Sequence, residues 1–197
     1  MHNEKIENLK PEFIEIKEIS KSDLYKDCIF GDFSSSYNII YTDMSDEHLK
    51  NFSFLSGEAI YDLACGNEAK NIIEFAHKVG CAQYVGVDVS KDNLKQSLET
   101  VEKGKNIKTQ FAECDILGFL EEMKDNSGNI MINGVDDVII EPHIANNDLY
   151  IEKIIEEIIR VIGDKYKFLG RGSNVIFDAI GEKLKKEKYL DIYIFSK

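Results

Sequence analysis

Arginine and proline are scarce in this chain of 197 residues, and no long apolar run occurs in it. The only two arginines are Arg160 and Arg171, so paired guanidinium clamps on phosphate groups are few. Two prolines and a hydrophobic content of 43% argue against a disordered or low-complexity protein. No stretch approaches the roughly 18 apolar residues that cross a bilayer, so we expect no membrane partner.

The four cysteines lie far apart, without a C-x-x-C pair, and the four histidines do not cluster with them. We therefore expect neither a metal site nor a disulfide framework, and reduced thiols are the default in a cytoplasmic protein. The first ten residues, MHNEKIENLK, are charged and lack the apolar core of a signal peptide. This also favours a cytoplasmic location.

Acidic residues outnumber basic ones by 36 to 24, which gives a formal net charge of −12. Because nucleic-acid binding depends on lysine and arginine neutralising phosphates, this balance disfavours a nucleic-acid partner. A chain of this length is long enough to bury a sizeable core. We divide it into an N-terminal helical and loop extension, residues 1–56, and a regular domain, residues 57–197.

Short apolar runs alternate five times with amphipathic segments from residue 58 onward. Strands are predicted at 58–65, 83–89, 107–115, from 129, at 165–173 and at 190–196. The predicted helices include one capped by Ser90, one with an isoleucine stripe over 151–162, and one over 175–189. This order predicts an α/β fold with a doubly wound, Rossmann-like, mostly parallel sheet and helices on both faces. Such sheets bind ligands at the carboxyl ends of their strands.

Three of the predicted strands end in small and acidic residues. The first ends in DLACGNE (62–68), the second in VGVDVS (85–90) and the third in AECDIL (112–117). Together with INGVDDVII (132–140), these segments resemble in order the motifs of class I S-adenosylmethionine-dependent methyltransferases, whose first motif is often DLGCGxG. The resemblance covers the chain from about Glu58 to its end. It implies S-adenosylmethionine as methyl donor and S-adenosylhomocysteine as product.

On the matching positions, the resemblance implies a set of donor-binding residues: Asp62, Ala64, Gly66, Asp88, Val89, Asp115, Ile116 and Asn133. Asp88 would accept hydrogen bonds from the ribose diol, and Asp115 from the adenine amino group. Val89 and Ile116 would sandwich the adenine ring. Asp62 would face the ammonium group of the donor, directly or through water, because an unpaired carboxylate inside an apolar run is costly.

The first motif departs from the family pattern. Of the three usual glycines only Gly66 is present, and it would let the ligand approach the backbone closely. Ala64 replaces the first glycine, which is a mild change. Glu68 replaces the third, where its carboxylate would repel the carboxylate of the donor unless the side chain turns outward. The single strand predicted after the last helix, where the family commonly has a hairpin, indicates a shortened edge.

Several of these residues also have a purely structural interpretation. Asp88 is alternatively a solvated turn acid, and Asp115 an N-cap of the following helix. Asn133, at the end of the fourth strand, would lie beside the reacting centre. The catalytic candidates are Asp137 and His143, which are alternatively a turn acid and a loop histidine.

The predicted function is direct transfer of the methyl group from the sulfonium to an unidentified, small-molecule acceptor. Residues 1–56 would then form a lid or the acceptor side of the site. A non-catalytic protein that keeps the methyltransferase fold is the alternative, and Glu68 is its best support. An oxidoreductase using a nicotinamide dinucleotide is disfavoured, because the first turn lacks GxGxxG. The fold does not identify the acceptor. The oligomeric state also stays open, with a homodimer as one option if the last strand is an exposed edge.

Overall fold

The computed structural model describes residues 16–26, 44–67, 69–101, 107–132, 145–171, 175–190 and 192–197. These residues form one eight-stranded sheet in the order β1-β4-β3-β2-β5-β6-β8-β7. The strands are β1 Ile16–Glu18, β2 Ala59–Leu63, β3 Gln83–Asp88, β4 Lys108–Glu113, β5 Asn129–Ile132, β6 Phe168–Arg171, β7 Lys185–Tyr189 and β8 Ile192–Ser196. The pairs from β1 across to β6 are parallel, whereas β8 runs antiparallel to both of its neighbours.

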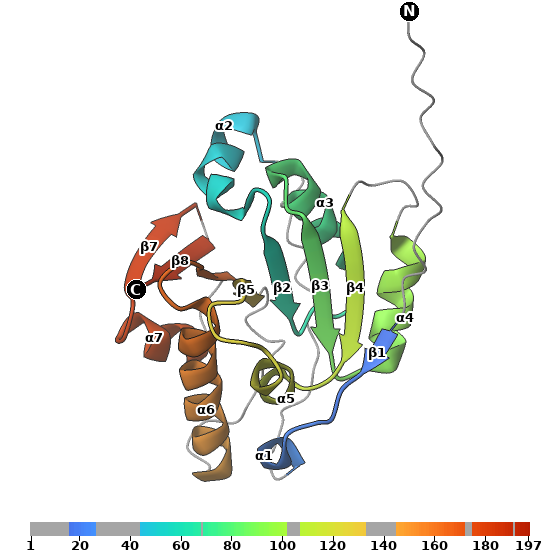
Figure 1. The fold of residues 1–197 in the computed structure, drawn as a ribbon, viewed down its shortest axis with the longest axis vertical. Helices are drawn as coiled ribbons and strands as arrows, with labels where there is room; N and C mark the ends of the chain where they lie inside the picture. Colours follow the sequence, from blue (N-terminus) through green and yellow to red (C-terminus); the bar gives the residue numbers. More distant parts are fainter. Residues whose placement is uncertain are drawn as a thin grey trace, which may run out of the picture.

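Helices connect the parallel strands (Figure 1). They are α1 Asp23–Lys26, α2 Asp46–Leu49, the 3-10 helix η2 Lys50–Leu55, α3 Ala69–Val79, α4 Lys91–Thr100, α5 Ile116–Glu121, α6 Ala145–Ile162 and α7 Val175–Gly181. The arrows of β2, β3 and β4 point the same way and end near α5, α1 and β1. This confirms the predicted Rossmann-like sheet, and it brings the carboxyl ends of three neighbouring strands together.

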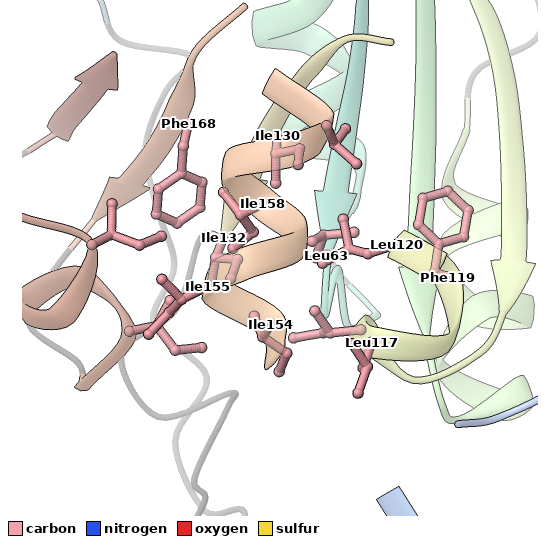
Figure 2. Close-up of a cluster of buried hydrophobic side chains, with 14 of the residues drawn as sticks. Leu63, Leu117, Phe119, Leu120, Ile130, Ile132, Ile154, Ile155, Ile158 and Phe168 are labelled. Carbon is pink, nitrogen blue, oxygen red and sulfur yellow. The ribbon is translucent and has the colours of Figure 1, made fainter. Parts of the chain in front are cut away.

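Each face of the sheet has its own buried cluster. On one face, α5, α6 and α7 pack against inward-facing strand residues, among them Leu63, Ile130 and Ile132. Figure 2 shows the isoleucines of α6 directed at these strand residues. On the other face, α3, α4 and η2 cover Ile60 and Tyr84. The alternation of strand side chains between two covered faces explains why these strands read as nearly continuous apolar runs.

The last part of the sheet differs from the prediction. Residues 175–189 were expected to be one helix, but α7 ends at Gly181 and β7 follows as a strand. β7 is an edge strand that pairs only with β8, and its lysines are exposed. A strand in this position needs no alternation of apolar residues, and its segment, KLKKEKY, has none. Lysine on an edge strand opposes pairing with other chains. The amino groups of Lys186 and Lys188 lie 4.2 and 5.2 Å from the ring centre of Tyr193, contacts that no local pattern reveals.

The C-terminal edge is therefore a hairpin of two strands, and the expected shortened edge is wrong. Because β8 lies between β6 and β7, the apolar last strand is not an exposed edge. The argument for a homodimer that depended on it no longer applies.

The segment before residue 57 also contains a strand that the sequence did not predict. Ile16–Glu18 pairs with Phe111–Glu113 at the edge of the sheet. Further along, Phe52 and Leu55 of η2 are fully buried and belong to the cluster with α3. Within the described ranges no helix combines the length and apolar content needed to cross a membrane.

Candidate functional site

Three acidic residues lie at the carboxyl ends of adjacent strands. Asp62 is the penultimate residue of β2, Asp88 is the last residue of β3, and Asp115 follows β4 by two positions. The strand pairing places Asp62 beside Gly86 and Asp88 beside Glu113. All three aspartates are buried. The structure thus brings the predicted carboxylates to one end of the sheet, although their contacts differ sharply.

The turn after β2 has two residues with left-handed backbone. Ala64 has φ of 59° and Gly66 has φ of 62°. Left-handed backbone favours glycine, so Ala64 is strained where the family has glycine. A Cβ atom built on Gly66 would meet no atom within 4 Å. The absence of a side chain at this position therefore leaves open space beside the backbone of the turn.

Asp88 holds this turn from the end of the neighbouring strand. Its Oδ2 accepts the backbone N–H of Gly66 at 2.9 Å. Its Oδ1 accepts the backbone N–H of Ser90 at 2.8 Å and the side-chain amide of Asn93 at 3.3 Å. Burial raises the pKa of Asp88 above its ordinary value, against the lowering effect of these hydrogen bonds. With 8% of its surface exposed, Asp88 is not a solvated turn acid. Ser90 is the N-cap of α4, as predicted.

Ser97 supports the same turn and was not predicted. This serine of α4 is fully buried. Its hydroxyl donates to the carbonyl of Gly66 at 3.1 Å and accepts the backbone N–H of Ala69 at 3.3 Å. It thereby satisfies one of the free N–H groups at the start of α3. The sequence contains one indication of this role. Ser97 lies one turn beyond Leu94 on the same side of the helix, and a buried hydroxyl there needs a hydrogen-bond partner.

Asp62 is paired inside the sheet. The hydroxyl of Tyr84 donates to its Oδ2 at 2.8 Å, which confirms the expectation that a carboxylate within this apolar run is paired or functional. The neighbouring Cys65 is half-buried, and desolvation raises the pKa of its thiol well above the ordinary value. The raised pKa favours the thiol over the thiolate, which argues against a nucleophilic role for Cys65.

Val89 and Ile116 border the ends of β3 and β4. Val89 is half-buried in the loop before α4, and Ile116 is the buried first residue of α5. Their contacts with the adenine ring stay predictions. Asn133, Asp137, His143 and Glu68 lie outside the described residues.

Asp115 is enclosed by donors from the protein. Its oxygens accept from the backbone N–H and hydroxyl of Ser22, the backbone N–H of Gly118 and the hydroxyl of Tyr150. The bond to Gly118 confirms that Asp115 is the N-cap of α5. The other donors come from distant elements, α6 and the loop before α1. No local pattern in the sequence indicates these donors.

The part of the chain that the structure describes holds no group of three or more metal-ligating side chains. The candidate site has three parts: the glycine turn held by Asp88 and Ser97, the Asp62–Tyr84 pair, and the enclosed Asp115. A turn with open space beside its backbone and a carboxylate at the next strand end can hold a small polar ligand.

Solved structures with this fold include several methyltransferases. An rRNA methylase from Streptococcus thermophilus aligns at 14% identity over 79% of this chain and 98% of its own, with a TM-score of 0.53. WbdD aligns at 11% identity over 77% of this chain and 40% of its own, with a TM-score of 0.55. A candidate S-adenosylmethionine-dependent methyltransferase from Listeria monocytogenes aligns at 13% identity over 63% of this chain, with a TM-score of 0.44.

This chain spans 52% of the Listeria protein's length. At these identities the likeness establishes the fold alone. No curated protein sequence is significantly similar to the chain. Residues 54–188, which include every described site residue, match the family described as "Methyltransferase domain". The chain therefore belongs to this family and has the fold of the class I S-adenosylmethionine-dependent methyltransferases.

Proposed function

We propose that this protein is an S-adenosylmethionine-dependent methyltransferase that acts on a small-molecule acceptor. The observation that supports this most directly is the unit formed by Gly66 and Asp88. A left-handed glycine with open space above it lies within hydrogen-bond distance of an acidic strand end. This pair of features suits a ligand that approaches the backbone closely and presents hydroxyl groups to a carboxylate.

The residues present are compatible with the donor. Oδ2 of Asp88 accepts one hydrogen bond from the protein, and a carboxylate oxygen has lone pairs for about two. One ribose hydroxyl can therefore be accepted without breaking the bond to Gly66. Asp62 supplies negative charge one strand away, where it would attract the ammonium group of the donor.

The chemistry would require little of the protein beyond alignment. When bound, S-adenosylmethionine supplies a methyl group already activated by its sulfonium, which an acceptor lone pair displaces from sulfur to leave S-adenosylhomocysteine. The turn would fix one end of the donor and Asp88 its ribose, so that binding sets the direction of approach for the acceptor. A base would be needed only for an acceptor that must lose a proton, and Asp137 and His143 are the candidates for that role.

The preference for a small acceptor depends on charge. The Streptococcus relative is, by its name, an rRNA methylase, but likeness at 14% identity transfers no substrate. The formal net charge of −12 and the presence of only two arginines oppose tight binding of a polyanion. Methyl transfer from radiolabelled donor to purified rRNA, at a rate that rises with RNA concentration, would contradict this part of the proposal.

Isothermal titration with S-adenosylhomocysteine, S-adenosylmethionine and NAD tests the donor assignment. We expect both sulfur ligands to bind and NAD not to bind. Asp88→Ala should weaken binding at least about tenfold, the effect of losing a hydrogen bond to a charged group. The matched control is Asp92→Ala, which removes an exposed acid of the adjacent helix and should change little. Failure of both sulfur ligands to bind the folded wild-type protein would overturn the proposal and favour a non-catalytic role.

A further inference from the structure

The segment Ile16–Lys26, hereafter the N-terminal strap, crosses the carboxyl end of β4. Its β1 part pairs in parallel with the last three residues of β4, and the backbone N–H of Ile19 continues the pairing by donating to the carbonyl of Glu113 at 3.2 Å. After Ile19 the strap turns toward α5, and α1 then lies close to α6 (Figure 1). The strap thus borders the strand end at which the family resemblance places the adenine of the donor.

Asp115 is the main polar attachment of the strap. Oδ1 accepts the backbone N–H of Ser22 at 2.8 Å, and Oδ2 accepts the Ser22 hydroxyl at 3.2 Å. The same hydroxyl accepts the backbone N–H of Tyr25 at 3.2 Å, so Ser22 joins the carboxylate to the first turn of α1. Ser22 and Asp115 are both buried, with exposed fractions of 6% and 1%.

Asp115 also accepts hydrogen bonds from the body of the protein. Oδ2 accepts the backbone N–H of Gly118 at 3.1 Å and the Tyr150 hydroxyl at 2.9 Å, besides the hydroxyl of Ser22. Three donors on this oxygen exceed the usual two. Oδ1 accepts the backbone N–H of Ser22, and because Asp115 is 1% exposed, the amino group of a ligand reaches this oxygen only if a packed neighbour moves away. The carboxylate therefore makes its contacts within the protein.

Gly118 shows that the strap and α5 are fitted to each other. A Cβ atom on Gly118 would lie 2.7 Å from the carbonyl oxygen of Ser20 and 2.9 Å from the backbone nitrogen of Ser22. Both are backbone atoms of the strap, so any side chain at this position forces the strap away. Apolar contact adds to the fit, because Ile19, Leu24 and Tyr25 pack against the core cluster.

We propose that Asp115 is a positioning residue that fastens the N-terminal strap over the end of β4, and that it does not read the amino group of the donor's base. The carboxylate joins the strap to α5 through Gly118 and to α6 through Tyr150. The seated strap then forms the wall of the base pocket. The statement about the base depends on the proposed function, whereas the fastening of the strap does not.

Amide hydrogen exchange tests the fastening without any ligand. In Asp115→Asn and in Gly118→Ala, the amides of Ile19, Ser22 and Tyr25 should exchange about tenfold faster, the factor expected for losing a hydrogen bond to a charged group. Exchange in α3 should not change. The matched control is Gly181→Ala in α7, where a Cβ would make ordinary contacts of 3.5 Å or more. Wild-type exchange of the strap in both test variants would overturn the proposal.

A pair of ligands tests the statement about the base. S-inosylhomocysteine lacks the amino group of S-adenosylhomocysteine but is otherwise closely similar. We expect the ratio of their dissociation constants in Asp115→Asn and Tyr150→Phe to stay within about twofold of the wild-type ratio, even where both ligands bind more weakly. A wild-type preference for S-adenosylhomocysteine that is lost only in Asp115→Asn would show that Asp115 reads the amino group. If neither ligand binds the wild-type protein, the proposed function fails, and the exchange experiment still decides the fastening.

Discussion

The backbone N–H of Gly66 donates to Oδ2 of Asp88 over 2.9 Å, so the end of β3 fixes the turn that follows β2. The two residues are 22 positions apart in sequence and meet because β2 and β3 are adjacent parallel strands. Asp88 therefore already holds the backbone of this turn in place when no ligand is bound. A bound ribose would add to this arrangement rather than create it, which reduces the ordering needed on binding.

The pH dependence of donor binding should report on Asp88. Burial raises the pKa of this carboxyl above its ordinary value of 3.8. Hydroxyl groups of a ligand donate to the ionised form, so binding lowers the pKa, and protonation opposes binding. The affinity for S-adenosylhomocysteine should thus be level near neutral pH and fall as the pH drops through the raised pKa. Titration calorimetry from neutral pH down through the acidic range in which the protein stays folded measures this, and an identical slope in Asp88→Asn would contradict it.

Replacing Ser97 with alanine should destabilise the turn and the protein together. The change leaves the carbonyl of Gly66 and the N–H of Ala69 without the partner that Ser97 provides in a buried place. We expect the free energy of unfolding to fall by about 1–3 kcal/mol, the usual cost of such a loss. Urea denaturation measures the change. Glu99→Ala, on the exposed side of the same helix, is the control and should shift stability by less than about 0.5 kcal/mol.

Ala64→Gly should stabilise the fold, in contrast to most substitutions by glycine. The left-handed backbone of Ala64 costs roughly 1–2 kcal/mol relative to glycine, while glycine loses about 0.5–1 kcal/mol through chain entropy. The midpoints of these two ranges differ by roughly 0.7 kcal/mol, which is the expected gain in the free energy of unfolding. Ala59→Gly at the start of β2, whose φ is negative, should instead lose stability. A loss for both variants would mean that the strain at Ala64 is relieved in some other way.

The sequence predicted the features that depend on local patterns. The strands β2 to β6 were recognisable from apolar runs, and Ser90 as a cap from its place before an amphipathic helix. The bond from Ser22 to Asp115 spans 93 residues and leaves no periodic trace, so the strap could not be foreseen. The hairpin at the C-terminus was misjudged because the lysines of β7 suit an exposed helix and an exposed edge strand equally well. Ala64 was judged a mild change because composition does not reveal the sign of φ.

Glu68→Gly provides the sharpest separation between a working and a degenerate methyltransferase. Glu68 stands where the family has its third glycine, next to the turn that contains Gly66, and its charge would oppose the carboxylate of the donor. We expect Glu68→Gly to bind S-adenosylmethionine more tightly than wild type, and Glu68→Gln to recover much of the gain because it removes only the charge. The comparison ligand is methylthioadenosine, which has no carboxylate and should bind all three proteins alike. Equal tightening for both ligands would point to a steric effect of Glu68, and no tightening for either would mean that the glutamate lies away from the donor.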